Sequence, residues 1–224
     1  MPFDRDQINE WEGPLKYPLR CKIKLCIELR ERFPKRRIIF CDADTFWKNP
    51  PPADSSLVFL HQYEPWVSDA SLGEYYSIVE SIALRRSGMF NSGLIGLPEA
   101  VDNKILSKVL EVSDTISLQL PSDMYLSEQY AFSCVLSPLP NFCTAEECVL
   151  HYWNCSSELE LETQHLSDSE FASLSEEALA GAMNRAVLRQ KTFSNRLRCR
   201  FRKFKRSIRK RQTEMKAFWI RLRA

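Results

Sequence analysis

The chain has 224 residues, of which 44% are hydrophobic, and this size and composition predict one globular domain with an appendage. It contains no run of about 20 apolar residues, and its acidic start lacks the order of a signal peptide, which argues against a membrane span or an export signal. The net charge of +2 is unevenly distributed: residues 185–224 carry +15 and the remaining 184 residues carry −13.

The first predicted element is a helix over residues 17–33, because apolar residues recur there at steps of three and four and Pro34 stops the pattern. A short buried strand is predicted over residues 38–41, where β-branched and aromatic residues are bounded by charge. Asp42 and Asp44 follow this strand directly. In open α/β sheets, ligands collect at the carboxyl end of a strand. Paired carboxylates there favour Mg²⁺ or Mn²⁺ carrying a phosphorylated substrate.

The later pattern alternates between short strands and helices, which predicts an α/β fold. Strands are predicted over 56–61, 90–97 and 149–153, and helices over 75–84, 101–112 and 123–133. The domain limits that we predict are 1–155 for the α/β domain, 156–175 for an acidic, serine-rich linker and 176–224 for a basic helical tail.

The tail is predicted to form an amphipathic helix. One stripe of the helix carries apolar residues and the other faces carry Lys and Arg; the stripe is Phe193, Leu197, Phe201, Phe204, Ile208, Met215, Phe218 and Leu222. Such a helix favours an anionic membrane surface, bound through residues 185–224. Packing on the core and nucleic-acid binding are the alternatives, and the repeated Phe residues make nucleic acid the less favoured one. The predicted location is the cytoplasm, at the inner face of a membrane.

Four segments in a fixed order resemble a known family. They are Asp42-Ala43-Asp44 after an apolar strand, Asn91-Ser92-Gly93 within 89–97, the acidic-Gln segment 123–129, and Leu150-His151-Tyr152-Trp153. Together they resemble the DXD motif and later motifs of GT-A glycosyltransferases, particularly the branch of glycogenin and galactosyltransferase-like enzymes. The resemblance covers residues 36–153, roughly half of the chain.

The resemblance implies a partial GT-A mixed sheet with flanking helices and a metal-dependent transfer of a sugar from a nucleotide diphosphate. It assigns Mn²⁺ or Mg²⁺ to Asp42, Asp44 and His151, with Asp42 also able to bind the ribose. A bound cation neutralises the departing diphosphate without proton transfer. The implied partners are a nucleotide-diphosphate sugar, most simply a UDP-sugar, and a glycan acceptor.

The resemblance also implies roles for residues between the DXD and His motifs. Asn91, Ser92 and Gly93 are expected beside the donor sugar or the acceptor, although the same residues also suit a turn before a core strand. Glu128 and Gln129 are the expected catalytic residues facing the reacting sugar. A surface pair on a helix is the alternative for these two. On the early helix, Lys16, Arg20 or Lys22 is positioned to reach a phosphate.

The sequence departs from the family in two places. Only 37 residues precede Ile38, so the strand and helix units that hold the nucleotide base in the family are not recognisable. Trp153-Asn154-Cys155 replaces the Lys-Pro-Trp that often follows the family's His. The alternative function is therefore an inactive glycosyltransferase remnant that acts as a membrane- or nucleic-acid-associated binding module.

Two other chemistries are less well supported. A phosphatase of the haloacid dehalogenase type needs Thr two places beyond the second Asp, where this chain has Phe46. A zinc site made of Cys143, Cys148 and His151 has unusual spacing. The eight cysteines are expected to be reduced thiols.

Overall fold

A computed structural model describes residues 3–43, 45–64, 69–121, 124–151, 178 and 181–182. The chain divides by its internal contacts into two units, residues 1–151 and 152–224. The predicted linker and the predicted basic tail lie almost entirely outside the described residues. Their limits at 155 and 175 stay predictions.

The first unit contains a mixed four-stranded sheet in the order β1-β4-β3-β5. Its strands are β1 (Ile38–Cys41), β3 (Val58–Leu60), β4 (Leu94–Leu97) and β5 (Phe142–Thr144). Strand β4 is antiparallel to both of its neighbours, whereas β3 and β5 are parallel. A second, antiparallel pair joins β2 (Thr45–Trp47) to β6 (Val149–His151). The predicted α/β class is confirmed.

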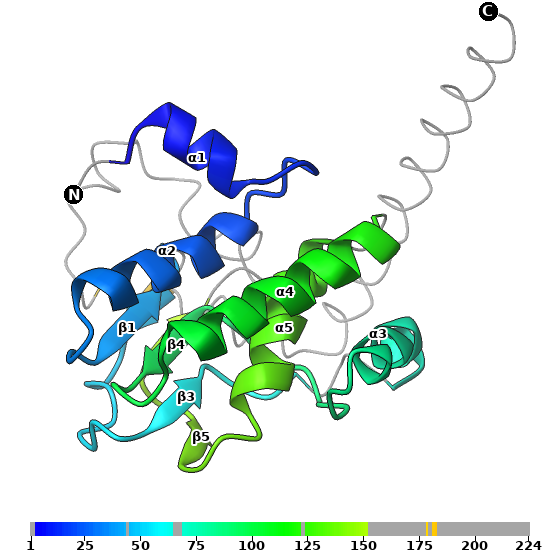
Figure 1. Ribbon diagram of the computed structural model, residues 1–224. Helices are drawn as coiled ribbons and strands as arrows, with labels where there is room; N and C mark the ends of the chain where they lie inside the picture. The colour runs from blue at the N-terminus through cyan, green and yellow to red at the C-terminus, as the bar shows by residue number, and fades with distance from the viewer. Residues whose placement is uncertain are drawn as a thin grey trace, which may run out of the picture. The chain divides into compact units, whose positions relative to one another are not determined.

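The helices are α1 (Arg5–Trp11), α2 (Arg20–Arg32), α3 (Asp69–Ser81), α4 (Asn103–Gln119) and α5 (Ser127–Leu136), with a 3₁₀ turn at Met124–Leu126. Helix α2 packs against β1 and α5 against β3, and α4 packs on both of these helices. Figure 1 shows α2 and α4 side by side, with α2 next to β1. The main core lies between these helices and the sheet, and includes Leu60, Ile95 and Leu97. Phe59 and Leu94 point to the other face, where they pack with Val149 of β6.

Local sequence explains where two helices differ from prediction. Helix α2 begins at Arg20 rather than at residue 17, because Pro18 disfavours a helical conformation at Tyr17. Helix α4 runs to Gln119, beyond the predicted end at residue 112, because its buried apolar stripe continues through Ile116. Asp102 caps α4 by accepting a hydrogen bond from the Ile105 amide at 3.0 Å.

Gly96 allows close packing between two strands. It lies opposite Phe59 in the β3–β4 pair, and a Cβ placed on Gly96 would overlap the Phe59 ring. We expect Gly96→Ala to lower the free energy of unfolding by about 1–3 kcal/mol, because the buried ring has no space into which to move. Urea denaturation measures this change.

Gly73 provides the matched control for this prediction. It lies within α3, and a Cβ built there meets nothing within 4 Å. Gly73→Ala should therefore raise the free energy of unfolding by about 0.5–1 kcal/mol through helix propensity alone. Equal effects of the two substitutions would contradict this account of the Phe59 contact.

Two further observations concern the described residues only. None of the helices there has the length and apolar character needed to cross a bilayer. The six cysteines described, Cys21, Cys26, Cys41, Cys134, Cys143 and Cys148, are free thiols.

Candidate functional site

The sheet topology brings the predicted motifs to one edge. Strands β1 and β3 run in the same direction and β4 runs against them, so the carboxyl end of β1 adjoins the start of β4. The Asp42 amide donates to the Gly93 carbonyl at 2.8 Å, which joins the DXD segment directly to the Asn-Ser-Gly segment. This edge of the sheet is called the motif edge below.

The side chain of Lys22 links three of the predicted elements at the motif edge. Its ammonium nitrogen Nζ lies 3.1 Å from Oδ2 of Asp42 and 3.3 Å from Oε1 of Glu128. It also donates to the hydroxyl and carbonyl oxygens of Ser92, both at 3.3 Å. Ser92 Oγ in turn donates to Oε2 of Glu128 at 3.1 Å. Lys22, Asp42, Ser92 and Glu128 are called the Lys22 cluster below.

Burial determines the electrostatics of the Lys22 cluster. Burial raises the pKa of Glu128, and the charge of Lys22 and the hydrogen bond from Ser92 offset part of that rise. Burial lowers the pKa of Lys22, but the charges of Glu128 and Asp42 outweigh it, so the net shift is upward. The cluster places one basic side chain between two acidic ones, with Asp42 the most exposed member.

Glu128 is buried at the motif edge, and the catalytic role predicted for it stays a prediction. Its side chain is only 2% exposed, and its two oxygens face Ser92 and Lys22. The Glu128 amide donates to the Tyr17 hydroxyl at 3.3 Å, which fixes the first turn of α5. Through Lys22, Glu128 is connected to Asp42 at the motif edge.

Gln129 offers a hydrogen-bond donor at the same helix end. Its amide nitrogen Nε2 is buried and has no hydrogen-bond partner in the described part of the chain. Buried amide donors are normally satisfied, so this one requires an acceptor other than the described protein atoms. The role predicted for Gln129 stays a prediction. Asp123, from the same acidic-Gln segment, lies outside the described residues.

Asn91 organises the second half of the motif edge. Its Oδ1 accepts from the Gly93 amide at 2.8 Å, and its Nδ2 donates to Oε1 of Glu64 at 2.9 Å. Nδ1 of His61 lies 3.3 Å from Asn91 Oδ1, and His61 Nε2 lies 3.3 Å from the Val149 carbonyl of β6. Asn91 thus holds a buried carboxylate and a buried imidazole together.

The structure describes the predicted metal ligands unequally. The Asp42 side chain is 26% exposed, and within the described residues its only side-chain partner is Lys22, which contacts Oδ2 and leaves Oδ1 available. The backbone of His151 lies opposite Thr45, one residue beyond Asp44, but the side chain of His151 and all of Asp44 lie outside the described set. Among the side chains that are described, no group of three His, Cys, Asp or Glu residues suits a metal ion.

The chemistry of the donors fits a hard divalent cation. Two carboxylates and an imidazole suit Mn²⁺ or Mg²⁺, and the pairing of β2 with β6 brings the DXD segment beside the late His segment. An available oxygen on Asp42 agrees with this assignment. The three predicted ligands nevertheless stay a prediction.

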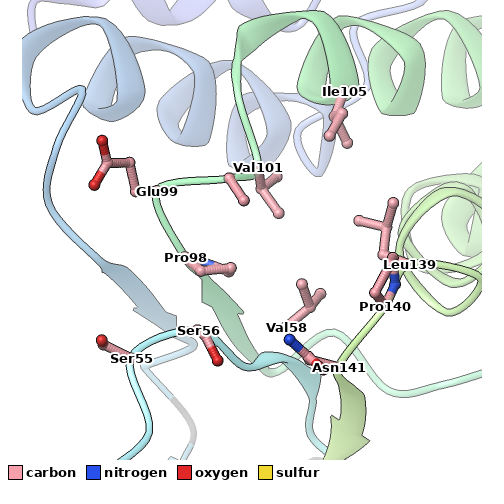
Figure 2. A pocket seen from close by; sticks show the side chains of 11 residues that line it. Ser55, Ser56, Val58, Pro98, Glu99, Val101, Ile105, Leu139, Pro140 and Asn141 are labelled. Atoms are coloured by element: carbon pink, nitrogen blue, oxygen red, sulfur yellow. The ribbon is translucent and has the colours of Figure 1, made fainter.

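A pocket of about 640 Å³ lies at the opposite edge of the sheet (Figure 2). Its lining is mostly apolar and comes from the start of β3, the turn after β4 and the segment before β5; Val58, Pro98, Val101, Ile105, Leu139 and Pro140 form its walls. Among the lining residues that the structure describes, Glu99 alone is titratable. The predicted site residues do not line it, so the pocket is separate from the motif edge.

Three residues at the motif edge belong to none of the four resembling segments: Lys22, His61 and Glu64. Lys22 was one of three bases predicted to reach a phosphate, and it alone of them enters the cluster with Asp42; Arg20 pairs with Asp114 at 2.7 Å instead. Lys16 contacts the Asn9 carbonyl. His61 and Glu64 were not predicted as site residues. They lie at and just after the end of the strand predicted over residues 56–61, and this position could have indicated a site.

Comparison with known proteins assigns no family. No protein-family model, no curated protein and no solved structure matches the chain. The resemblance to GT-A glycosyltransferases therefore rests on the four sequence segments.

Proposed function

We propose that residues 1–155 form a GT-A-like domain that binds a nucleotide-diphosphate sugar through Mn²⁺ or Mg²⁺ and transfers the sugar to a glycan acceptor. One observation supports this most strongly: Asp42, Ser92 and Glu128, taken from three separate sequence motifs, meet around one buried ammonium group. Motifs that matched the family by chance would have no reason to converge at one edge of a sheet.

In this proposal the residues of the motif edge have distinct tasks. Asp42, Asp44 and His151 hold the cation, which would neutralise charge on the departing diphosphate. Lys22 fixes the orientation of Asp42 and leaves Oδ1 available. Gln129 offers its buried amide nitrogen to a ligand acceptor. Asn91 keeps the loop before β4 in place through its bonds to Gly93 and Glu64.

Titration calorimetry with UDP in the presence of Mn²⁺, and again with excess EDTA, tests the proposal. We expect binding that requires Mn²⁺ and that weakens at least tenfold in Asp42→Asn. This variant keeps the side-chain shape and leaves Lys22 paired with Glu128. Asp6→Asn, in the first turn of α1, is the control and should bind like the wild type.

Three outcomes separate the candidate functions. Equal UDP affinity with and without Mn²⁺, or in wild type and Asp42→Asn, would contradict the metal-dependent site. Mn²⁺-dependent binding with release of UDP from a UDP-sugar supports the enzyme. Binding without any turnover across a panel of UDP-sugars supports the inactive remnant.

The membrane partner belongs to the same proposal but rests on sequence alone. Residues 185–224 lie outside the described residues, so the anionic membrane surface and the cytoplasmic location stay predictions. The excess charge of +15 in this segment is what favours them.

A further inference from the structure

The ammonium group of Lys22 is held at the motif edge by more than its contact with Asp42. Glu128 Oε1 and both the carbonyl and the hydroxyl oxygen of Ser92 lie 3.3 Å from Lys22 Nζ. The centre of the Phe40 ring lies 5.3 Å from the same nitrogen, within the range of a cation–π contact. The Lys22 side chain is 8% exposed. The ammonium group therefore stays anchored even if Asp42 turns to another partner.

Asp42 shares its carboxylate with this fixed positive charge. Lys22 Nζ lies 3.1 Å from Oδ2, while Oδ1 has no side-chain partner among the described residues. Burial lowers the pKa of Lys22, but the nearby carboxylates raise it by more, so the group is an ammonium ion at neutral pH. A divalent cation on Oδ1 would be bound by a carboxylate that already neutralises another cation.

Two effects of Lys22 on a cation at Asp42 have opposite signs. By bonding Oδ2, Lys22 limits rotation of the carboxylate, which favours metal binding. By its charge, Lys22 opposes a divalent cation, and this repulsion is twice that between two unit charges at the same distance. Because Lys22 is buried, solvent screens the repulsion only weakly. A short side chain such as Asp42 has little conformational freedom to lose, so the repulsion is the larger effect.

A bound diphosphate reverses this balance. Its phosphate groups carry more negative charge than a divalent cation carries positive charge, so the complex of the two is attracted by the ammonium group. We propose that Lys22 makes the site selective for the complex of a divalent cation with a diphosphate over the free cation. This selectivity rests on the proposed function, because it concerns the same cation site at Asp42. The cation and the nucleotide then bind together rather than one after the other.

Electron paramagnetic resonance of Mn²⁺ tests the selectivity, because the signal of the free ion falls when the ion binds. Mn²⁺ is titrated into the full chain without nucleotide. We expect Lys22→Met to bind free Mn²⁺ at least tenfold more tightly than the wild type. Lys24→Met, on the same helix, should bind like the wild type. Adding Asp42→Asn to each protein gives the binding by other carboxylates, which is subtracted.

A second pair of variants guards against loss of the fold in Lys22→Met, which leaves Glu128 without its cationic partner. Glu128→Gln alone is compared with the double variant that carries Lys22→Met and Glu128→Gln. These two proteins differ only at residue 22, and neither has a buried carboxylate at residue 128. Removing Lys22 should again tighten the binding of free Mn²⁺ at least tenfold. Circular dichroism shows which variants are folded.

The outcomes separate the selectivity from the proposed function. Unchanged or weaker binding of free Mn²⁺ after removal of Lys22, in either folded pair, would overturn the selectivity and leave Lys22 as an orienting group only. Calorimetry in which the wild type binds free Mn²⁺ as tightly as a preformed Mn²⁺–UDP complex would also overturn it. Both results leave the proposed function intact if UDP binding still requires Mn²⁺ and Asp42. A wild type that binds neither Mn²⁺ nor Mn²⁺–UDP through Asp42 would contradict both proposals.

Discussion

Replacing Lys22 with methionine is expected to lower the free energy of unfolding by about 3–5 kcal/mol at neutral pH, the range observed when one partner of a buried ion pair is removed. Methionine matches the length and shape of the lysine stem but supplies no charge. Glu128 then keeps only the Ser92 hydrogen bond, with 2% of its side chain exposed. Urea denaturation of Lys22→Met measures the loss.

Lys24→Met is the matched control, because Lys24 lies on the same helix and forms none of the contacts described for Lys22. Its effect should stay within about 0.5 kcal/mol. A comparable loss in both variants would point to helix propensity or solubility rather than to the ion pair. The double variant with Lys22→Met and Glu128→Gln should recover part of the stability, because the uncompensated carboxylate is gone.

The pH dependence of the Lys22→Met deficit follows from the pKa of Glu128. Burial already raises that pKa, and removing Lys22 removes the charge that opposes the rise. A folded-state pKa above the unfolded value means that stability is greatest at low pH and is lost as the pH rises through the folded-state pKa. The deficit should therefore shrink as the pH falls from 7 toward the ordinary glutamate value of 4.5. A deficit that is the same at pH 7 and pH 5 would contradict this cause.

Arg30→Met is expected to lower the free energy of unfolding by about 3–5 kcal/mol, because several buried carbonyl groups lose a charged donor at once. Arg30 is 3% exposed, and its guanidinium group donates to five backbone carbonyl oxygens. The acceptors are Phe33 at 3.4 Å, Pro34 at 3.1 Å, Arg36 at 2.7 Å, Leu97 at 3.0 Å and Pro98 at 2.7 Å. These bonds join the end of α2 to the end of β4.

Two further variants separate geometry from charge at this position. Arg30→Lys keeps the charge but has one donor nitrogen instead of a planar fork, so we expect it to retain only about half of the stabilisation. Arg32→Met, two residues further along α2, removes an exposed ion pair with Glu28 and should cost about 0–1 kcal/mol. Thermal and urea unfolding of Arg30→Met, Arg30→Lys and Arg32→Met rank the three variants by their stability. Arg30→Lys as stable as the wild type would show that charge alone suffices.

Local patterns predicted the strand that carries the site. The limits of β1 are those predicted, residues 38–41, because Arg37 and Asp42 end the apolar run on both sides. Strand β3 falls within its predicted span. Strand β4 begins at Leu94 instead of residue 90, because the Asn91 side chain binds the Gly93 amide and Glu64, so the ladder does not extend through this loop.

Elements that depend on distant partners were not predicted. Strand β2 has three residues and exists by pairing with β6, which lies about a hundred residues later in the chain. Strand β5 is equally short and is held by β3. Helix α1 was also missed, although Asp4 caps it by accepting from the Gln7 amide at 2.8 Å. Such short elements carry too few residues for periodicity to reveal them.

The sequence motifs predicted which segments form the motif edge, but they did not predict the ion pairs of Lys22 with Asp42 and Glu128. The carboxyl end of β1 and the loop before β4 were both predicted to carry site residues, and the sheet brings them together. No spacing rule connects Lys22 to Asp42 and Glu128, because the three lie on a helix, a strand end and another helix. Their contact depends on how α2 and α5 pack on the sheet, which is a property of the tertiary structure.

The position of β4 between β1 and β3 has a consequence for the synthesis of this protein. Strands β1 and β3 leave the ribosome before β4, the strand that pairs with both of them. Neither strand can therefore complete its backbone hydrogen bonds through a local hairpin. The nascent chain must keep two apolar strands apart until residues 94–97 arrive and are inserted between them. Non-local pairing of this kind slows folding and prolongs the interval in which the unpaired strands are open to aggregation.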